Sequence, residues 1–515
     1  MTTKLLFLII CNLVICNLQL SQNITNTLGT SGMFKIKDGS TDFFTINQST
    51  GTINLVSPLA GNQRGSIFKG TDRFLHTYSG TGTQGNNTFL GINSGNFTLG
   101  GTTYQGINNT GVGYQSLFSL TTGYSNSAFG SNSLKNNTAG LLNSAFGHSS
   151  LESNKSGFGN SAFGSNTLRV TETSNGNSAF GYSALELNTT GNYNSAFGSN
   201  TLQGNFIGNY NSAFGYSSLI WNYAGNNNSA FGVYSLQTNG GDYNSAFGYS
   251  SLYSNNLGYQ NSAFGMNSLY SNTEGWHNTG VGYDALKNNV VGYQNTAVGH
   301  HSLLSNTGNY NTAIGYNSGS TVTTGSNLTL IGIDANPTSP TATDQITLGN
   351  QFVNSLRCNV TTITSLSDRR DKKNIKELSV GLDFITKLKP RQFNWDRREW
   401  YEDGISDGSK IKHEPTAGFI AQELDSVQTQ TGADWLNLVL KDNPEKWEAT
   451  PGNLLPVMVK AIQELNEKCE GLKTENEKLK NDLEQLNDIK EKLTVLTGLI
   501  NEIKQNNKEI KLTEK

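Results

Sequence analysis

The chain has 515 residues, more than one ordinary domain holds, with 57 glycines, only 8 prolines and a formal net charge of −3. Because the charge is nearly balanced, no global basic field exists to attract nucleic acid or an anionic membrane, and the glycines lack the three-residue period of collagen. Of the 75 charged residues, 53 fall between 367 and 515 and only 10 between 87 and 330. The chain therefore contains two segments of very different charge content.

Residues 1–21 have the layout of a secretory signal peptide. Lys4 precedes an apolar run from Leu5 to Cys16, which is too short to span a bilayer, and we expect a cut after Ser21. Lipidation at Cys16 and an uncleaved anchor are the alternatives. No later segment approaches the roughly 18 consecutive apolar residues of a membrane span. The sequence therefore predicts a secreted or cell-surface protein.

Cysteine usage predicts neither a disulfide framework nor a metal site. The four cysteines are Cys11, Cys16, Cys358 and Cys469, and the first two lie in the signal segment. The other two lack metal-ligand spacing, so we expect no metal and no other cofactor.

Residues 22–86 are predicted to form an N-terminal β cap. Alternating residues at 34–37 indicate a strand, Asp38-Gly39 indicates a turn, and strand-forming residues recur at 43–46 and 53–56. Nothing in this segment has the pattern of a catalytic site.

Residues 87–332 form a repeat region. The string Asn-Ser-Ala-Phe-Gly, or a looser copy of it, recurs every 17 residues, and twice after 16. It starts at Asn109, Asn126, Asn143, Asn160, Asn177, Asn194, Asn211, Asn228, Asn244, Asn261, Asn278, Asn295 and Asn311. Seventeen residues cannot hold a helix pair but suit one coil of short strands and turns, so the period predicts a mainly β solenoid.

Each repeat has one large aromatic and one leucine as its main apolar residues, as in Phe197 and Leu202. Stacked coils predict one buried column of Phe and another of Leu, and asparagines able to hydrogen-bond to their copies one coil away. A disordered Asn/Gly/Ser tract is the alternative, but disorder does not require an aromatic in fixed register. Because this core is thin for a single chain, the repeats favour an oligomeric fibre.

The Asn-Ser-Ala-Phe-Gly repeats resemble the left-handed β-roll heads of trimeric autotransporter adhesins over about residues 109–332. The resemblance implies a trimeric, ligand-binding fibre, for which a cell-surface glycan or protein is the expected ligand class. The chain lacks that family's evident membrane-anchor barrel, so self-translocation is not implied. Residues 333–366 are expected to be a β linker.

The candidate chemistry lies after the linker, where the chain reads Ser-Asp-Arg-Arg-Asp-Lys-Lys-Asn-Ile from Ser367. Ser367 and Lys372 supply a hydroxyl and an amine, and a lysine amine activates a hydroxyl only when neutral, a form that burial or neighbouring positive charge favours. A Ser-His-Asp triad could use only His413, so a Ser-Lys dyad is simpler. The plain alternative is a serine in a solvated turn or helix cap.

This segment resembles the intramolecular chaperone domain of phage endosialidase and other tail-spike proteins, serine peptidase family seventy-four. The family's string Ser-Asp-x-Arg-x-Lys-x-x-Ile is complete here, and the resemblance runs to Lys468, giving a chaperone and autopeptidase domain at 367–468. It implies that three domains associate, guide folding of the fibre and then cut themselves off.

The resemblance also implies the roles of individual residues. Ser367 would be the nucleophile, Lys372 the general base and Asp368 a supporting residue that orients Lys372. The expected scissile bond joins Leu366 to Ser367, and the bond from Ser367 to Asp368 is the alternative.

Residues 456–515 are predicted to form a C-terminal helix and a trimeric coiled coil, because apolar residues repeat in steps of three and four. The predicted seam comprises Ile462, Leu465, Cys469, Leu472, Asn476, Leu479, Leu483 and Leu486, then Leu493, Leu496, Ile500, Ile503, Asn507 and Ile510. Ile489 joins the two parts through two successive steps of three, a stammer that overwinds a coil locally. A single amphipathic helix lying on the domain is the alternative.

Together these features predict a secreted homotrimeric fibre that matures by its own C-terminal serine peptidase, with no nucleic-acid partner. A phage-like tail fibre with the same maturation and an uncleaved trimerisation clamp are the alternatives. A polysaccharide-degrading spike fits less well, because glycosidases need paired carboxylates and those of the repeat region lie mostly in separate coils. They are Glu152, Glu172, Glu186, Asp242, Glu274 and Asp284.

Overall fold

The structure is a computed structural model that describes residues 33–38, 41–47, 50, 52–55, 66–78, 85–100, 104–353, 355–357 and 367–513. The chain divides into two compact units, Met1–Asn354 and Ser355–Lys515, which we describe separately. The predicted signal segment and Leu366 lie outside the described residues. The first unit is a β-solenoid and the second is α+β, so the predicted fold class is confirmed.

Antiparallel strands precede the solenoid. Strands β1 (Met33–Asp38), β2 (Thr41–Asn47) and β3 (Thr52–Leu55) form a three-stranded sheet. Strands β4 (Ile67–Lys69) and β5 (Asp72–His76) form a hairpin that pairs with β6 (Thr88–Leu90), the first strand of the solenoid. The hairpin supplies backbone partners to an edge strand that would otherwise be open at this end.

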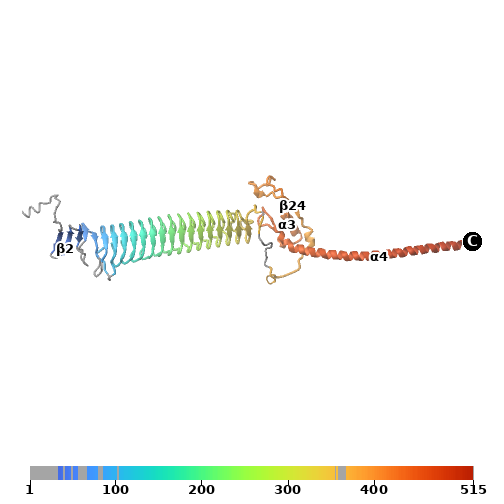
Figure 1. Cartoon of the computed structure of the whole chain (residues 1–515), viewed down its shortest axis with the longest axis horizontal. Coiled ribbons are helices and arrows are strands. Elements are labelled where there is room, and N and C mark those ends of the chain that lie inside the picture. Colours follow the sequence, from blue (N-terminus) through green and yellow to red (C-terminus); the bar gives the residue numbers. More distant parts are fainter. Residues whose placement is uncertain are drawn as a thin grey trace, which may run out of the picture. The chain divides into compact units, whose positions relative to one another are not determined.

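The solenoid is one ladder of short parallel strands, one per coil, in which each strand lies opposite the same three repeat positions of the next (Figure 1). After β6 its strands are β7 (Thr110–Val112), β8 (Ser127–Phe129), β9 (Ser144–Phe146), β10 (Ser161–Phe163), β11 (Ser178–Phe180), β12 (Ser195–Phe197), β13 (Ser212–Phe214), β15 (Ser229–Phe231), β17 (Ser245–Phe247), β18 (Ser262–Phe264), β19 (Thr279–Val281), β20 (Thr296–Val298), β21 (Thr312–Ile314), β22 (Thr329–Ile331) and β23 (Ile346–Leu348). A second parallel pair is formed by β14 (Trp221–Asn222), which precedes β15 in the chain, and β16 (Thr238–Asn239), which precedes β17. The ladder therefore extends into the segment assigned to the linker.

From β8 to β18 the interior of each coil holds the alanine of the strand, the leucine and the first asparagine of the repeat. In the coil that starts at Asn194, that asparagine, Ala196 and Leu202 all have zero exposure. The predicted leucine column is therefore confirmed, and it is buried from Leu117 to Leu303.

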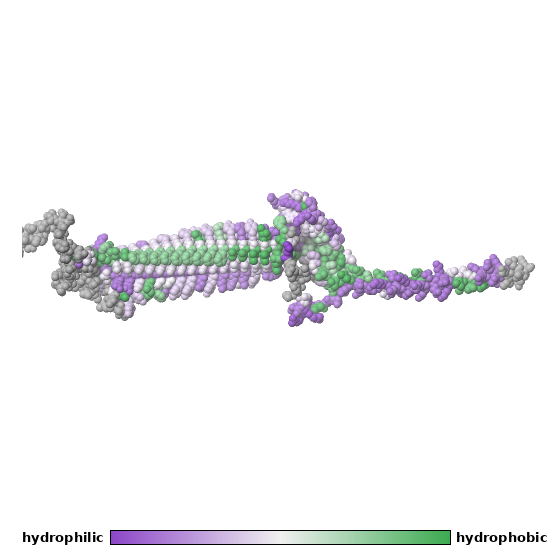
Figure 2. Space-filling model, in the orientation of Figure 1, coloured by the Kyte–Doolittle hydropathy of each residue, from purple (hydrophilic) through white to green (hydrophobic). Residues whose placement is uncertain are grey.

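The predicted burial of the phenylalanine column is wrong. Phe129 and Phe247 are 36% exposed and Phe264 is 42% exposed, and no phenylalanine from Phe129 to Phe264 in this column is buried. Successive side chains of a strand point to opposite faces, so an inward alanine puts the next residue outside. The column forms an apolar stripe on the solenoid surface, which Figure 2 shows as a continuous green band.

An asparagine ladder connects successive coils through the interior, as the sequence predicts. Asn194 Oδ1 accepts hydrogen bonds from the backbone N–H and the Nδ2 of Asn211 (3.0 and 3.1 Å), and Asn194 Nδ2 donates to the Gly208 carbonyl (2.9 Å). The ladder also survives a 16-residue coil, because the N–H of Asn244 donates to Asn228 Oδ1 (2.9 Å). The shortened coil therefore leaves the asparagine column in register.

The coil that starts at Asn194 has four left-handed backbone positions, Gly198, Asn200, Leu202 and Tyr210. Gly198 has φ 138°, and a Cβ there would lie 2.5 Å from the Gly215 carbonyl oxygen, so this position needs glycine. Leu202 has φ 51°, a conformation that costs a bulky residue about 1–2 kcal/mol. Full burial of a leucine contributes about 1.5–3 kcal/mol, which offsets that cost.

A buried histidine, His76 on β5, packs against the first coil of the solenoid. The N–H of Tyr78 donates to His76 Nδ1 (3.4 Å), so the ring proton lies on Nε2, which donates to the Ser94 carbonyl (2.9 Å). The ring packs 4.8 Å from Phe89 and 4.7 Å from Phe97, centroid to centroid. Burial lowers the pKa of His76 from 6.5 to about 4, and Arg73 nearby adds to this effect.

The second unit packs small elements around the start of a long helix. They are η1 (Arg369–Asp371), α2 (Leu382–Ile385), β24 (Arg391–Phe393), η2 (Arg398–Trp400), β25 (Thr416–Gly418), α3 (Ala421–Gln430), η3 (Asp434–Leu436), β26 (Val439–Leu440), β27 (Glu448–Ala449), η4 (Pro451–Leu454) and α4 (Leu455–Thr513). Strands β24 and β25 pair antiparallel, as do β26 and β27. The core includes Phe384 from α2, Leu436 from η3, Leu454 from η4 and Val457 from α4. The first turns of α4 are therefore part of the domain.

Helix α4 continues for 59 residues, and its predicted seam residues from Ile462 to Ile503 are exposed. Leu479 and Leu486, for example, are 58% and 63% exposed. The alternative of a helix lying on the domain would bury this seam, so it does not describe the structure. In the part of the chain that the structure describes, no helix has the length and apolar character needed to cross a membrane.

The asparagine ladder generates a first prediction. Asn194→Ala would leave the buried N–H of Asn211 without its partner, whereas the Gly208 carbonyl would keep its second donor, Asn205 Nδ2 (2.9 Å). We expect a loss of about 1–3 kcal/mol, the usual cost of one unsatisfied buried group. Urea unfolding of the solenoid measures this loss. Ser199→Ala, in the same coil but outside the interior, is the control and should change stability little; equal losses in both variants would contradict the ladder's role.

The buried histidine generates a second prediction. The unfolded chain protonates this imidazole near pH 6.5 and the folded chain only near pH 4, so the stability of this end falls as the pH drops through that window. The full loss is about 3 kcal/mol, at roughly 1.4 kcal/mol per pKa unit. Hydrogen-exchange protection of β4–β6 at pH 7 and 4.5 measures it. His76→Gln should remove the acid response, whereas the exposed His148→Gln should keep it; an unchanged response in His76→Gln would refute the assignment.

Candidate functional site

One short turn forms the candidate site. Asp368 precedes the one-turn helix η1, and its carboxylate accepts a hydrogen bond from the backbone N–H of Arg370 (2.8 Å). The turn closes where the N–H of Lys372 donates to the Arg369 carbonyl (3.2 Å). This reversal of the chain brings the residues on either side of η1 close together.

An ion pair reinforces the turn. Arg370 Nη2 lies 2.7 Å from Asp368 Oδ2, and Arg370 Nε also donates to the same carboxylate. The hydrogen bonds from the Arg370 side chain and then from its backbone hold the pKa of Asp368 below its ordinary value. The Asp368 carboxylate has its hydrogen bonds to Arg370 and none to Lys372 among the described residues. The supporting role expected of Asp368 toward Lys372 stays a prediction.

The turn brings the two predicted catalytic side chains into hydrogen-bond contact. Lys372 Nζ lies 2.5 Å from Ser367 Oγ, although the residues are five apart in sequence. A charged amine donates in this contact, and a neutral amine could accept the hydroxyl proton. Both side chains are exposed, as are those of Arg369 and Lys373 beside them.

The other candidate residues lie elsewhere. The His413 side chain is exposed, and the backbone carbonyl of this residue accepts a hydrogen bond from Asn394 Nδ2 (2.9 Å). Glu423, which is not among the predicted site residues, forms an ion pair with Arg391 (2.6 Å). Ile375, the last residue of the Ser-Asp-x-Arg-x-Lys-x-x-Ile string, is 59% exposed, so no core in the single chain explains it.

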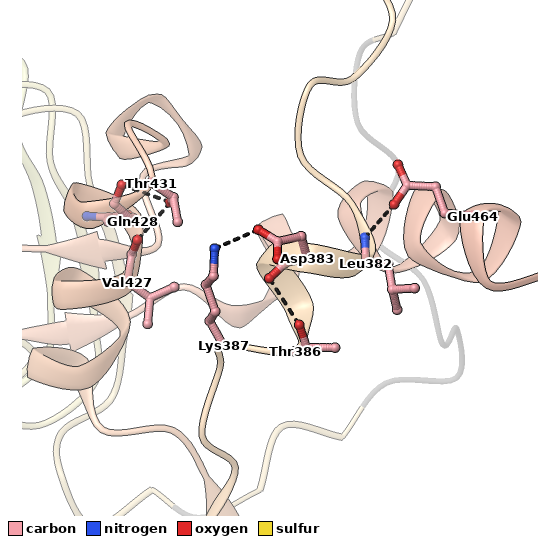
Figure 3. A network of polar contacts seen from close by, with 8 residues as sticks. All are labelled: Leu382, Asp383, Thr386, Lys387, Val427, Gln428, Thr431 and Glu464. Carbon is pink, nitrogen blue, oxygen red and sulfur yellow. Dashed lines mark hydrogen bonds and ion pairs between the residues drawn. The ribbon is translucent and has the colours of Figure 1, made fainter. Parts of the chain in front are cut away.

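A polar network ties α2 to α4, as Figure 3 shows. Glu464 Oε2 on α4 accepts a hydrogen bond from the N–H of Leu382 at the start of α2 (2.7 Å). One α2 residue, Asp383, binds Lys387 (2.6 Å) just after the helix ends. The long helix is therefore fixed to the segment that follows the Ser-Lys turn. Sequence reasoning missed Glu464, because its partner is a backbone N–H 82 residues away.

Comparison with known proteins agrees with this region of the chain. Residues 367–433 match the family described as chaperone of endosialidase, starting at Ser367 and ending just after α3. No curated protein and no solved structure matches the chain. The resemblance that the Ser-Asp-x-Arg-x-Lys string predicts is therefore confirmed, and the C-terminal unit carries a domain similar to the chaperone of endosialidase.

Proposed function

We propose that this protein is a secreted trimeric fibre whose C-terminal domain guides assembly and then releases itself by Ser-Lys autoproteolysis. The observation that carries the proposal is the 2.5 Å contact between Lys372 Nζ and Ser367 Oγ, at the first residues of the segment that matches the chaperone family. The solenoid supplies the fibre. Its expected ligand is a cell-surface glycan or protein.

The proposed chemistry is an acyl shift followed by hydrolysis. Neutral Lys372 takes the proton of the Ser367 hydroxyl, and Oγ attacks the carbonyl carbon of Leu366. The bond from that carbon to the Ser367 nitrogen breaks, the nitrogen receives the proton, and an ester forms. Water then hydrolyses the ester, leaving a fibre that ends at Leu366 and a fragment that begins at Ser367. The bond between Ser367 and Asp368 is the alternative.

Several exposed features of the single chain support assembly before cleavage. A lysine acts as a base only when neutral, and an exposed lysine gains that form on burial or beside other positive charges. The dyad, the string's Ile375 and the α4 seam are all exposed in one chain. Three copies joined along the seam of α4 would hold their domains around one axis, where these surfaces could be covered.

The repetitive sequence of the fibre explains why a chaperone is needed to align the chains. Neighbouring coils are so similar that three chains aligned one coil out of register would lose little energy. A clamp that joins the chains at one end fixes the register before the solenoid forms. Once the solenoid is folded the clamp is dispensable, because the fibre persists kinetically.

Two other functions keep the same fold. An uncleaved clamp needs only the coiled coil and the core, and it predicts that Ser367 has no effect on the mass of the chain. A tail fibre of a phage-like particle would mature in the same way but would not need the signal-like residues 1–21. The proposal of a secreted fibre rests on that segment.

A first experiment tests the dyad. Intact mass spectrometry of the expressed chain should find a fragment ending at Leu366 and one spanning 367–515. Ser367→Ala and Lys372→Ala should stay whole, because one lacks the nucleophile and the other the base. Lys372→Arg keeps the charge but cannot lose its proton, so it should also stay whole.

Light scattering on the same samples gives the assembly state. If the wild type forms trimers and stays whole, autoproteolysis is refuted and the domain is a permanent clamp. Cleavage in Lys372→Ala at the wild-type rate would refute the role of Lys372 as the base and leave the role of Ser367 as the nucleophile.

A second experiment tests the turn. Asp368→Ala loses both the backbone cap and the ion pair with Arg370, and we expect cleavage to slow by roughly five- to tenfold, since loss of a cap weakens a turn. Asp368→Asn keeps a capping oxygen and should recover part of the rate. Asp371→Asn, a neighbouring exposed acid, is the control and should cleave normally. If Asp368→Asn were as inactive as Ser367→Ala, Asp368 would act in the chemistry itself.

A further inference from the structure

The outward residue of every strand in the solenoid ladder is apolar, and these residues form one unbroken column. We call this column the apolar stripe. Its members are Leu90, Val112, Phe129, Phe146, Phe163, Phe180, Phe197, Phe214, Phe231, Phe247, Phe264, Val281, Val298, Ile314, Ile331 and Leu348. No charged residue interrupts it from the first coil to the last.

The apolar stripe is nearly straight. Consecutive phenylalanine rings from Phe129 to Phe264 are 4.6–5.0 Å apart, centroid to centroid, and their planes differ by only 2–8°. Such small rotations keep the column on one side of the solenoid, as the green band of Figure 2 shows. A straight column can meet another straight column along its whole length.

The exposed area of the stripe is large for a surface that faces water. Nine of its members are 36–51% exposed, which is roughly 50–130 Å² each if a large side chain carries about 150–250 Å². With the remaining phenylalanines, the stripe exceeds the roughly 300–600 Å² of the largest patch on a typical monomer. An exposed patch of this size indicates an interaction surface.

The flanks of the stripe also favour close approach. From β7 to β22 the strand residue two positions before each stripe member is Ser or Thr, small and uncharged, so nothing charged is desolvated there. The column two residues after the stripe mixes Tyr182, Tyr216 and Tyr249 with Ser165 and Ser199. That column is interrupted, so the stripe is the continuous apolar surface.

We propose that the apolar stripe is the face along which copies of this chain pack side by side, parallel and in register. A partner that covers the stripe must present apolar groups at the same spacing of about 4.8 Å over every coil. A second copy of this chain has the same spacing because it has the same coils. The parallel, in-register arrangement rests on the trimer of the proposed function, since a C-terminal clamp aligns equal coils at equal heights.

A pair of cysteine variants in one coil tests this surface. Val281 belongs to the stripe and Val291 lies ten residues later in the same coil, and the two are 36% and 50% exposed. Val281→Cys and Val291→Cys are made in full chains whose natural cysteines are serine. Both changes are small and preserve the fold, which circular dichroism checks. A short bis-maleimide then links cysteines that lie close together.

We expect linked pairs in Val281→Cys at least about tenfold above Val291→Cys, because groups held together react at millimolar effective concentration. Equal linking in both variants, or linking only through Val291→Cys, overturns the stripe as the interface. The same samples report assembly and cleavage. A trimeric, cleaving chain without links at 281 refutes the stripe alone, whereas a linked chain that never cleaves retains the stripe and refutes autoproteolysis.

Discussion

The vertical alignment of asparagines through the solenoid is the constraint on which the rest of the fibre depends. Each Oδ1 accepts from the backbone N–H one coil away, and each Nδ2 donates to a backbone carbonyl; at Asn194 the Oδ1 also accepts from the Nδ2 of Asn211. These buried groups have no water to replace a lost partner, so every coil must return to the same place. The 16-residue coil at Asn228 obeys the rule by shortening elsewhere.

That constraint also decides which surfaces are left apolar. In the ladder from β8 to β18 the inward strand position holds alanine, and the phenylalanine that follows it stands on the outer face of the coil. In the other unit, α4 gives its first turns to the core and leaves its later seam exposed. Both units therefore carry long, regular apolar surfaces without a partner in one chain, a pattern that symmetric association satisfies.

Much of the site could be predicted from a nine-residue string. Ser367 and Lys372 are five apart, a separation that a capped single turn closes, and the string carries its own cap in Asp368 and its own ion-pair partner in Arg370. The supporting role expected of Asp368 toward Lys372 stays a prediction, and the carboxylate itself binds Arg370. Glu464 could not be foreseen, since nothing in a helical sequence indicates a distant backbone donor.

By itself the sequence determined the period of the fibre, the leucine column, the asparagine ladder and the pairing of hydroxyl with amine. All of these depend on residue types at fixed spacing, and that spacing can be read directly from the sequence. Only the tertiary structure decided which way the phenylalanines face and that leucines such as Leu202 adopt the left-handed conformation. Those choices depend on how much volume a closed coil leaves inside, a property of the folded coil that no local pattern contains.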